Sequence, residues 1–435
     1  MKKLSGFQLT LLAVFGACAV SGVLIFAIAT SSSKSSSVGP VVIWGTVDGP
    51  TFTQMVQNAA STYPALGGVT YVQKDPTTYA SQLTAALAAG SGPDLFLMTQ
   101  DQAVEDSGEV MLFPFTSVSI TQFKNAFIEG ADPFLVPKGI VALPIAADPL
   151  VLYWNKDLMA TGGYAQPPQY WDQLYAIATK MTQRDDAGNI LKSAVALGEY
   201  QNIDDAKDTL VALILQAGGT LTSYDSTGKL DSAISKVGIN TSEPAVETAL
   251  RFFTEFSDPS KTDYSWNGSL PEASQDFAQG NLALYIGYAS EQPLIKKENP
   301  NLNFAVAALP QIRGASHSVD FARVYGLAIT RTSQNLAGAQ AVAATLVATA
   351  NSAAYATAFN LSSARRDVLS QPATGDQSLF NAETIISYGW TDPSPDKTGS
   401  LFQAMIENTT SGSMLIGDAV GRADAQMTQI LSGQQ

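Results

Sequence analysis

The sequence predicts an α/β fold, in which strands alternate with helices along the chain. Short apolar runs, such as residues 41–44 and 69–72, have the length and the β-branched content of buried strands. Segments with helical spacing, such as residues 51–63, separate these runs. Strands that alternate with helices indicate β-α-β units and a mainly parallel sheet. Apolar residues make up 46% of the chain, which is ample for real cores.

Local signals bound each expected element. Gly45 ends the first strand, and Gly90 ends an alanine- and leucine-rich helix, because glycine interrupts regular structure. In the first part of the chain we expect a strand at 41–44, a helix at 51–63, a strand at 69–72, a helix at 79–89 and a strand at 93–98. Further on we expect a helix at 206–216, a helix at 241–257, strands at 282–287, 305–310 and 325–330, and a helix at 337–350.

Residues 144–157 are the most informative segment. A strand-type apolar run there ends in an Asn155-Lys156-Asp157 turn. Ten residues later, Pro167-Pro168 precedes Trp171-Asp172, an aromatic and an acidic residue that open a helix. This order resembles the crossover segment of the extracellular solute-binding proteins of ABC importers, family 1, in the branch of maltose- and oligosaccharide-binding proteins. The elements expected on either side follow the same family's order over nearly all of residues 41–435.

The resemblance implies a two-lobed periplasmic-binding-protein fold of type II, with hinge-linked lobes and a ligand cleft between them. Lobe one would comprise residues 41–147 and 311–360, and lobe two residues 150–307 and 365–435. The chain would cross between the lobes near residues 147–150, 307–311 and 360–365. The resemblance also implies that Trp171 packs in the core of lobe two.

The N-terminus predicts export. Residues 7–29 carry no charge, and about 20 such residues span a membrane, so residues 1–29 are expected to anchor the protein. Cleavage after the Ala-x-Ala pattern at 27–29 is the alternative, which would leave the protein secreted or periplasmic. Lys2 and Lys3 should stay inside, so that the body faces out. The serine-rich residues 30–40 are expected to form a flexible tether.

Composition excludes several functions. The formal net charge of −14 argues against nucleic acid, because phosphate binding needs a basic face. The only cysteine, Cys18, lies in the apolar segment, and the only histidine, His317, lies in a loop-like stretch. This excludes zinc sites of the usual N/S type and a cysteine nucleophile, and a solvated loop is the expected place for His317. Residues 185–189 lack the calcium-loop pattern and predict a tight turn. We therefore expect no catalytic residue, no metal and no cofactor.

An oligosaccharide site needs aromatic faces for sugar rings and polar groups for hydroxyls, on loops that follow strands. The resemblance places such residues in the cleft. The predicted ligand contacts are Trp44, Thr46, Asp48, Thr99, Gln100, Asp148, Tyr288, Glu291, Arg323, Tyr325 and Trp390.

Several of these residues have a structural alternative. Trp44 suits a buried strand end, and Asp48 and Thr99 suit helix caps. Asp148 precedes Pro149 and suits a turn. Trp390 suits a surface cap over its loop. Met98 stands where the family can have a tryptophan, which weakens the case for a maltodextrin-type ligand.

The sequence thus predicts a monomeric substrate-binding component of an ABC importer. It would capture an extracellular carbohydrate by hinge closure and deliver it to the permease subunits, without chemistry. One alternative is an exported carbohydrate-active hydrolase, although no compelling carboxylate pair appears. Another is the same fold binding a polyamine, a peptide or iron, or serving a sensor. Ferric binders of this fold use adjacent tyrosines, and this sequence has no Tyr-Tyr pair.

Overall fold

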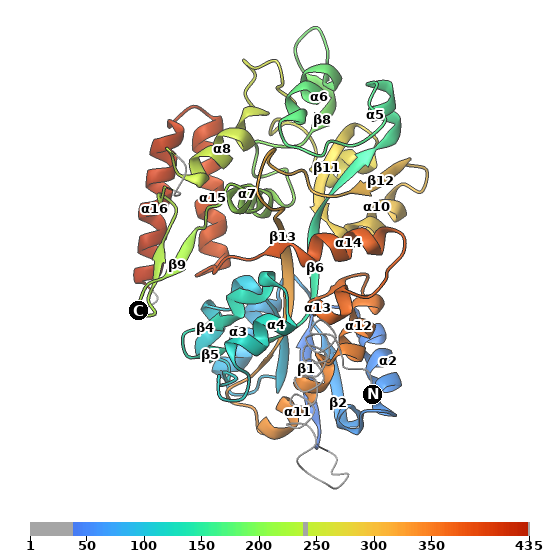
Figure 1. Cartoon of the computed structure of the whole chain (residues 1–435), viewed down its shortest axis with the longest axis vertical. Helices are drawn as coiled ribbons and strands as arrows, with labels where there is room; N and C mark the ends of the chain where they lie inside the picture. Colours follow the sequence, from blue (N-terminus) through green and yellow to red (C-terminus); the bar gives the residue numbers. More distant parts are fainter. Residues whose placement is uncertain (1–37, 238–241, 434–435) are drawn as a thin grey trace, which may run out of the picture.

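Two lobes lie one above the other along the long axis of the molecule in the computed structural model (Figure 1). The structure describes residues 38–237 and 242–433. The predicted anchor and most of the tether lie outside these residues. Within them, no helix combines the length and the apolar character that a membrane span requires.

Most strands of both lobes join in one large sheet, and the other four strands of the described residues pair, fourth with fifth and ninth with tenth, in two separate two-stranded sheets. The strands are β1 (Val41–Gly45), β2 (Val69–Gln73), β3 (Leu95–Thr99), β4 (Leu135–Val136), β5 (Gly139–Ile140), β6 (Leu143–Asn155), β7 (Gln183–Arg184), β8 (Ile190–Val195), β9 (Thr222–Tyr224), β10 (Leu230–Ser232), β11 (Leu282–Tyr288), β12 (Phe304–Ala307), β13 (Asp320–Ile329), β14 (Ser362–Ser363) and β15 (Ser387–Tyr388).

Helices surround this sheet in both lobes (Figure 1). The α-helices are α2 (Gly49–Ala60), α3 (Tyr79–Ala88), α4 (Ile120–Ala126), α5 (Lys156–Thr161), α6 (Gln173–Met181), α7 (Ala206–Gln216), α8 (Ala245–Glu255), α9 (Ala273–Ala278), α10 (Gln292–Glu298), α11 (Leu336–Leu346), α12 (Thr349–Ala358), α13 (Arg366–Leu369), α14 (Asp376–Ile385), α15 (Pro395–Thr410) and α16 (Ile416–Ser432). The short 3₁₀ helices are η1 (Pro64–Gly68), η2 (Gln100–Gln102), η3 (Glu105–Gly108), η4 (Glu129–Phe134) and η5 (Ala289–Glu291).

The large sheet has the order β2-β1-β3-β13-β6-β11-β8-β7 and passes through both lobes. β1 pairs in parallel with β2 and β3, as β-α-β units require. β13 and β6 pair antiparallel to each other at the centre, and β11 pairs antiparallel to β6. β6 is 13 residues long and fully extended, so its backbone connects the lobes without a loop.

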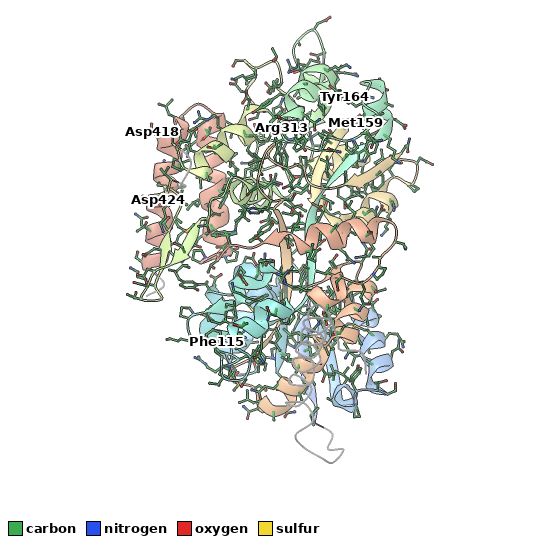
Figure 2. The ribbon with its side chains drawn as sticks, in the orientation of Figure 1. Phe115, Met159, Tyr164, Arg313, Asp418 and Asp424 are labelled. Atoms are coloured by element: carbon green, nitrogen blue, oxygen red, sulfur yellow. The ribbon has the colours of Figure 1, made fainter. Side chains whose placement is uncertain are left out.

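Each lobe has its own hydrophobic core. The lower lobe in Figure 1 is the expected lobe one, and its core takes its buried residues from 41–147 and 322–369. The upper lobe is the expected lobe two, and its core takes them from 150–309, Phe321 and 380–431. Along β6, Ala147 belongs to the lower core and Leu150 to the upper one. Figure 2 shows side chains filling both lobes, with Phe115 in the lower and Met159 in the upper. Between these cores, Asp148 and Pro149 lie at the junction.

Most expected elements form within a few residues of their predicted bounds, and Trp171 lies in the upper core as predicted. Two expectations were wrong in detail. The strand expected at 325–330 begins earlier, at Asp320. The helix expected at 337–350 is two helices, because Ala348 takes an extended backbone between α11 and α12. The predicted tight turn forms, since Asp185 Oδ1 accepts from the backbone N–H groups of Ala187 and Asn189.

Candidate functional site

Strand register brings five of the predicted residues to one face of the sheet where the lobes meet. Arg323 on β13 lies directly opposite Asp148 on β6, and Tyr325 lies opposite Thr99. Tyr288 lies opposite Leu150, two residues beyond Asp148. Residues that face each other across an antiparallel pair share a face, as do residues two apart in a strand. Thr99, Asp148, Tyr288, Arg323 and Tyr325 therefore form one polar stripe across the sheet.

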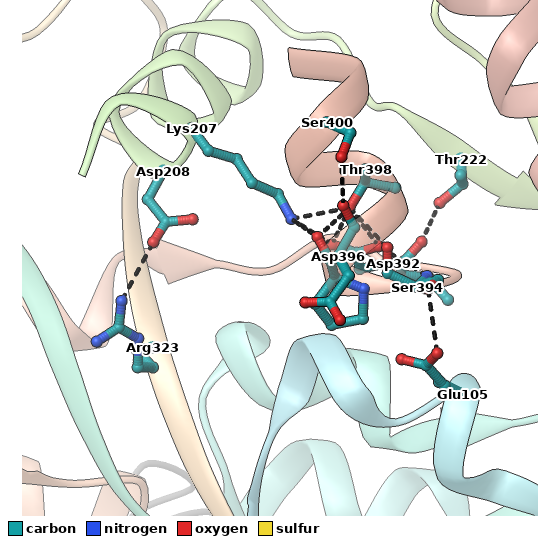
Figure 3. Close-up of polar contacts among 12 residues, drawn as sticks. Glu105, Lys207, Asp208, Thr222, Arg323, Asp392, Ser394, Asp396, Thr398 and Ser400 are labelled. Carbon is teal, nitrogen blue, oxygen red and sulfur yellow. Dashed lines mark hydrogen bonds and ion pairs between the residues drawn. The ribbon is translucent and has the colours of Figure 1, made fainter. Parts of the chain in front are cut away.

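Arg323 connects this stripe to helix α7. Its guanidinium carbon lies 4.0 Å from the centroid of the Tyr288 ring, a cation–π contact. Its Nη2 lies 3.4 Å from Asp208 Oδ2 and 3.7 Å from Asp205 Oδ1. The Tyr288 hydroxyl donates to Asp208 Oδ2 at 2.6 Å. Arg323 follows a residue of the lower core, whereas Asp205 and Asp208 lie beside the upper one, so this ion pair bridges the lobes (Figure 3).

Glu291 holds the end of β11. Its Oε2 accepts from the Tyr285 hydroxyl at 2.6 Å, and its Oε1 accepts from the Tyr288 N–H at 2.7 Å. Burial raises the pKa of Glu291. Burial, and then the negative charge of Glu291, raise the pKa of Asp205 well above its ordinary value. The two carboxyls thus favour a state in which one of them keeps a proton.

Asp148 is a buried carboxyl with one oxygen that accepts no hydrogen bond. Its Oδ1 accepts from the Ser290 N–H at 3.0 Å, and the residue is 1% exposed. Its Oδ2 has no hydrogen-bond partner in the structure. Burial raises the pKa of Asp148 to about 6, against the opposing effects of Ser290 and Arg323.

A cavity of ≈ 480 Å³ opens at the junction of the lobes, with Arg323 in its wall. Charged and polar side chains dominate the lining. The lining residues are Asp101, Tyr200, Gln201, Ile203, Asp204, Asp205, Ala206, Lys207, Asp208, Glu272, Arg323 and Gln403. Among the described residues, no group of three or more His, Cys, Asp or Glu side chains is placed to hold a metal ion. The arrangement can therefore hold a polar solute by hydrogen bonds and charge.

Lys207 ties the first turn of α7 to the segment before α15 (Figure 3). Its Nζ lies 2.7 Å from Asp392 Oδ2 and 2.8 Å from Thr398 Oγ1. The Asp392 side chain is fully buried, and burial raises its pKa to about 6 although Lys207 lowers it. The hydroxyl of Ser394 donates to Glu105 Oε1 at 3.1 Å, across to the other lobe. The wall of the cavity is thus fixed by a buried ion pair.

Of the predicted ligand contacts, Arg323 is the one in the cavity lining. Trp44 in β1 and Thr46 and Asp48 after it have other surroundings. Lys74 stacks on Trp44, with Nζ 3.6 Å from the ring centroid. Asp48 caps α2, since its Oδ2 accepts from both the N–H and the hydroxyl of Thr51. Thr46 is half-buried in the loop between them. Asp48 therefore takes the helix-capping role that its sequence position also allowed.

Trp390 is a predicted ligand contact, but its side chain packs in the upper core. The residue is 4% exposed, and its ring lies 6.4 Å from that of Phe402. Thr99 lies on the polar stripe, but its backbone N–H and hydroxyl both donate to Gln102 Oε1 in a capping box.

Gln100 is a predicted ligand contact, but its side chain forms hydrogen bonds with the backbone of β13. It is 3% exposed, its Nε2 donates to the carbonyl of Ala322, and its Oε1 accepts from the N–H of Val324 at 2.6 Å. Gln100→Leu should lower the free energy of unfolding by about 1–2 kcal/mol, because two buried backbone groups lose their partners. Urea denaturation would measure this. The exposed Gln371→Leu is the matched control, and equal losses in both variants would contradict the role.

The sequence did not single out Asp101, Asp205, Lys207 or Asp208. The available signal was the charged run at 204–208, directly before a long apolar helix. Such a run is also typical of an ordinary helix start, where acidic residues favour the N-terminus. Only the approach of Arg323 from β13 distinguishes these carboxylates from surface residues.

Comparison with known proteins adds independent findings. The family model described as bacterial extracellular solute-binding protein matches residues 44–353. A putative binding protein of Brucella abortus is 24% identical over 298 residues, covering 67% of each chain. An ABC transporter solute-binding protein of Thermotoga lettingae bound with α-D-tagatose superposes with a TM-score of 0.65 at 21% identity, over 90% of this chain and 100% of that one. A cyclo/maltodextrin-binding protein complexed with maltotetraose gives 0.71 at 18% identity, over 92% and 98%.

Proposed function

The chain belongs to the bacterial extracellular solute-binding proteins, and from this premise we propose that it is the substrate-binding component of an ABC-type importer. Its solute would be an extracellular carbohydrate. The observation that carries the proposal is the cavity at the junction of the lobes, lined by Asp101 and Arg323 on one side and the start of α7 on the other. The two solved neighbours named above support the sugar, since each holds one.

Capture would proceed by closure of the lobes. β6 and β13 run through the junction as continuous strands, so small changes along them would swing one lobe against the other. Sugar hydroxyls are donors and acceptors, and the carboxylates, amides and guanidinium of the lining match both roles. The family and the fold are those of binding proteins, and we propose that the solute leaves unchanged.

The moving units would be those expected from the resemblance, residues 41–147 with 311–360 and residues 150–307 with 365–435. The upper core includes Phe321, and the lower core runs from Ala322 to Leu369, so we place the second crossing between Phe321 and Ala322 and the third between Leu369 and Phe380. The body would act outside the membrane as a monomer, held by residues 1–29, and would deliver its solute to permease subunits.

The test is isothermal titration calorimetry of the purified protein with mono- and oligosaccharides. The solute is then recovered and checked for cleavage. One sugar class should bind, raise the melting temperature and be recovered intact. At 100-fold over the dissociation constant, such binding stabilises the native state by about 2.7 kcal/mol. Cleaved sugar would instead establish a hydrolase, and binding of a peptide or metal alone would overturn the carbohydrate assignment.

A further inference from the structure

We propose that the solute carries a positive charge, so that the captured carbohydrate bears a protonated amino group. This inference rests on the proposed function and names the chemistry that the cavity selects. Acidic side chains dominate the cavity wall, which holds Asp101, Asp204, Asp205, Asp208 and Glu272 against Lys207 and Arg323.

The two basic side chains of the wall are already engaged. Arg323 pairs with Asp205 and Asp208, and Lys207 pairs with Asp392 behind the wall. This leaves three acidic residues, Asp101, Asp204 and Glu272, with no ion pair to a basic side chain among the described residues. Asp204 accepts from the N–H and hydroxyl of Ser274, which leaves its charge uncompensated. Burial, and then the negative charge of Asp204, raise the pKa of Glu272.

Two carboxylate oxygens add an independent observation. Asp148 Oδ2 and Asp101 Oδ1 are both buried without a hydrogen-bond partner. Asp148 is 1% exposed and lies behind the lining, on the same sheet face as Arg323, whose side chain lines the cavity. Asp101 lines the cavity itself. A buried acceptor without a donor is costly, and an ammonium group that reached these oxygens as the lobes close would supply both donors and the opposite charge.

The same wall offers little for a neutral oligosaccharide. Such ligands gain affinity from aromatic faces stacked on sugar rings. Tyr200 is the one aromatic residue in the described lining. Tyr288 is 2% exposed with its ring against Arg323, and Trp390 is in the upper core. Charge is therefore the main source of selectivity that this wall provides.

Calorimetric titration of the full-length protein with matched probes tests the inference. The probes are β-1,4-linked glucosamine oligosaccharides, the same oligosaccharides N-acetylated, maltotriose and spermidine. We expect the amine-bearing sugar to bind at least about tenfold more tightly than its acetylated partner. We also expect its affinity to fall with added salt and its binding to release protons, because a cation stabilises the ionised carboxylates.

Each outcome separates the inference from the function on which it rests. Equal or tighter binding of a neutral sugar would overturn the charge proposal and leave the carbohydrate function standing. Binding of spermidine without any sugar would support a cationic solute and overturn the carbohydrate. Failure of every cationic probe to bind would also overturn the charge proposal.

Matched variants test which wall carboxylates bind the ammonium group. Asp101→Asn keeps the shape of the side chain and loses no hydrogen bond at Oδ1, and Glu272→Gln removes a second wall charge. Each should weaken binding of the amine-bearing probe severalfold while the unfolding midpoint stays unchanged. Asp186→Asn, in the exposed turn before β8, is the control. Unchanged affinity in both wall variants would contradict the inference.

Discussion

Lys207→Met is expected to lower the free energy of unfolding by about 3–5 kcal/mol, because it leaves the fully buried carboxyl of Asp392 without its cation. Lys207 is itself largely buried, with 17% of its side chain exposed, so water cannot replace it. The substitution should also weaken the contact between α7 and α15 in the cavity wall, since the same ammonium donates to the Thr398 hydroxyl at the start of α15. Urea denaturation at neutral pH measures the loss.

Two further variants make this test specific. Lys297→Met removes an exposed lysine from α10 and should change stability by no more than about 0.5 kcal/mol. The double variant Lys207→Met with Asp392→Leu removes both charges, and it should recover part of the loss. A loss in Lys207→Met no larger than in the surface control would show that the pair contributes nothing.

Stability is expected to fall as the pH rises from about 5 to 8, and Glu383→Gln should remove the part of this fall that Glu383 contributes. Glu383 and Asp320 are 5% and 0% exposed, next to the junction of the lobes. Burial raises the pKa of Glu383 to about 7. Burial, and then the charge of Glu383, raise that of Asp320 well above its ordinary value. Their pKa values in the unfolded chain are about 4.

The sign follows from proton binding. Between pH 4 and 7 the folded protein holds protons that the unfolded chain has lost, so its stability is greatest below this window and declines through it. Glu383→Gln places a neutral group beside Asp320, and the amide oxygen can still accept from the Leu309 N–H. The variant should therefore be more stable than the parent at pH 8, by up to about 3 kcal/mol, and little changed at pH 5.

Denaturation by urea at pH 5 and pH 8 measures both effects. The exposed Glu298→Gln, at the end of α10, is the matched control and should follow the parent at both values. Equal stability of the parent at the two pH values would show that these carboxyls titrate normally. Asp320, whose pKa burial raises first of all, and the buried Asp148 and Asp392, whose pKa values burial raises to about 6, should leave a residual pH dependence in the variant.

Part of the candidate site was predictable. Asp148, Tyr288, Glu291, Arg323 and Tyr325 follow from strands and from the order of elements, and the structure gathers them at the junction. Their use in ligand binding stays a prediction. Their partners Asp205 and Asp208 were missed, because an acidic helix start looks the same whether or not a cation approaches it.

The sequence by itself determined the alternation of strands and helices, the buried strand at β6 and the family, because apolar periodicity and element order are local properties of the chain. The tertiary structure alone decided which polar groups meet. The Gln100 side chain donates to the carbonyl of a residue 222 positions away, and Lys207 pairs with Asp392, 185 positions away. Such partners come together through the packing of distant segments, so a local sequence pattern does not predict them. Burial, which sets the pKa of Asp148 and Glu383, likewise exists only in the folded lobes.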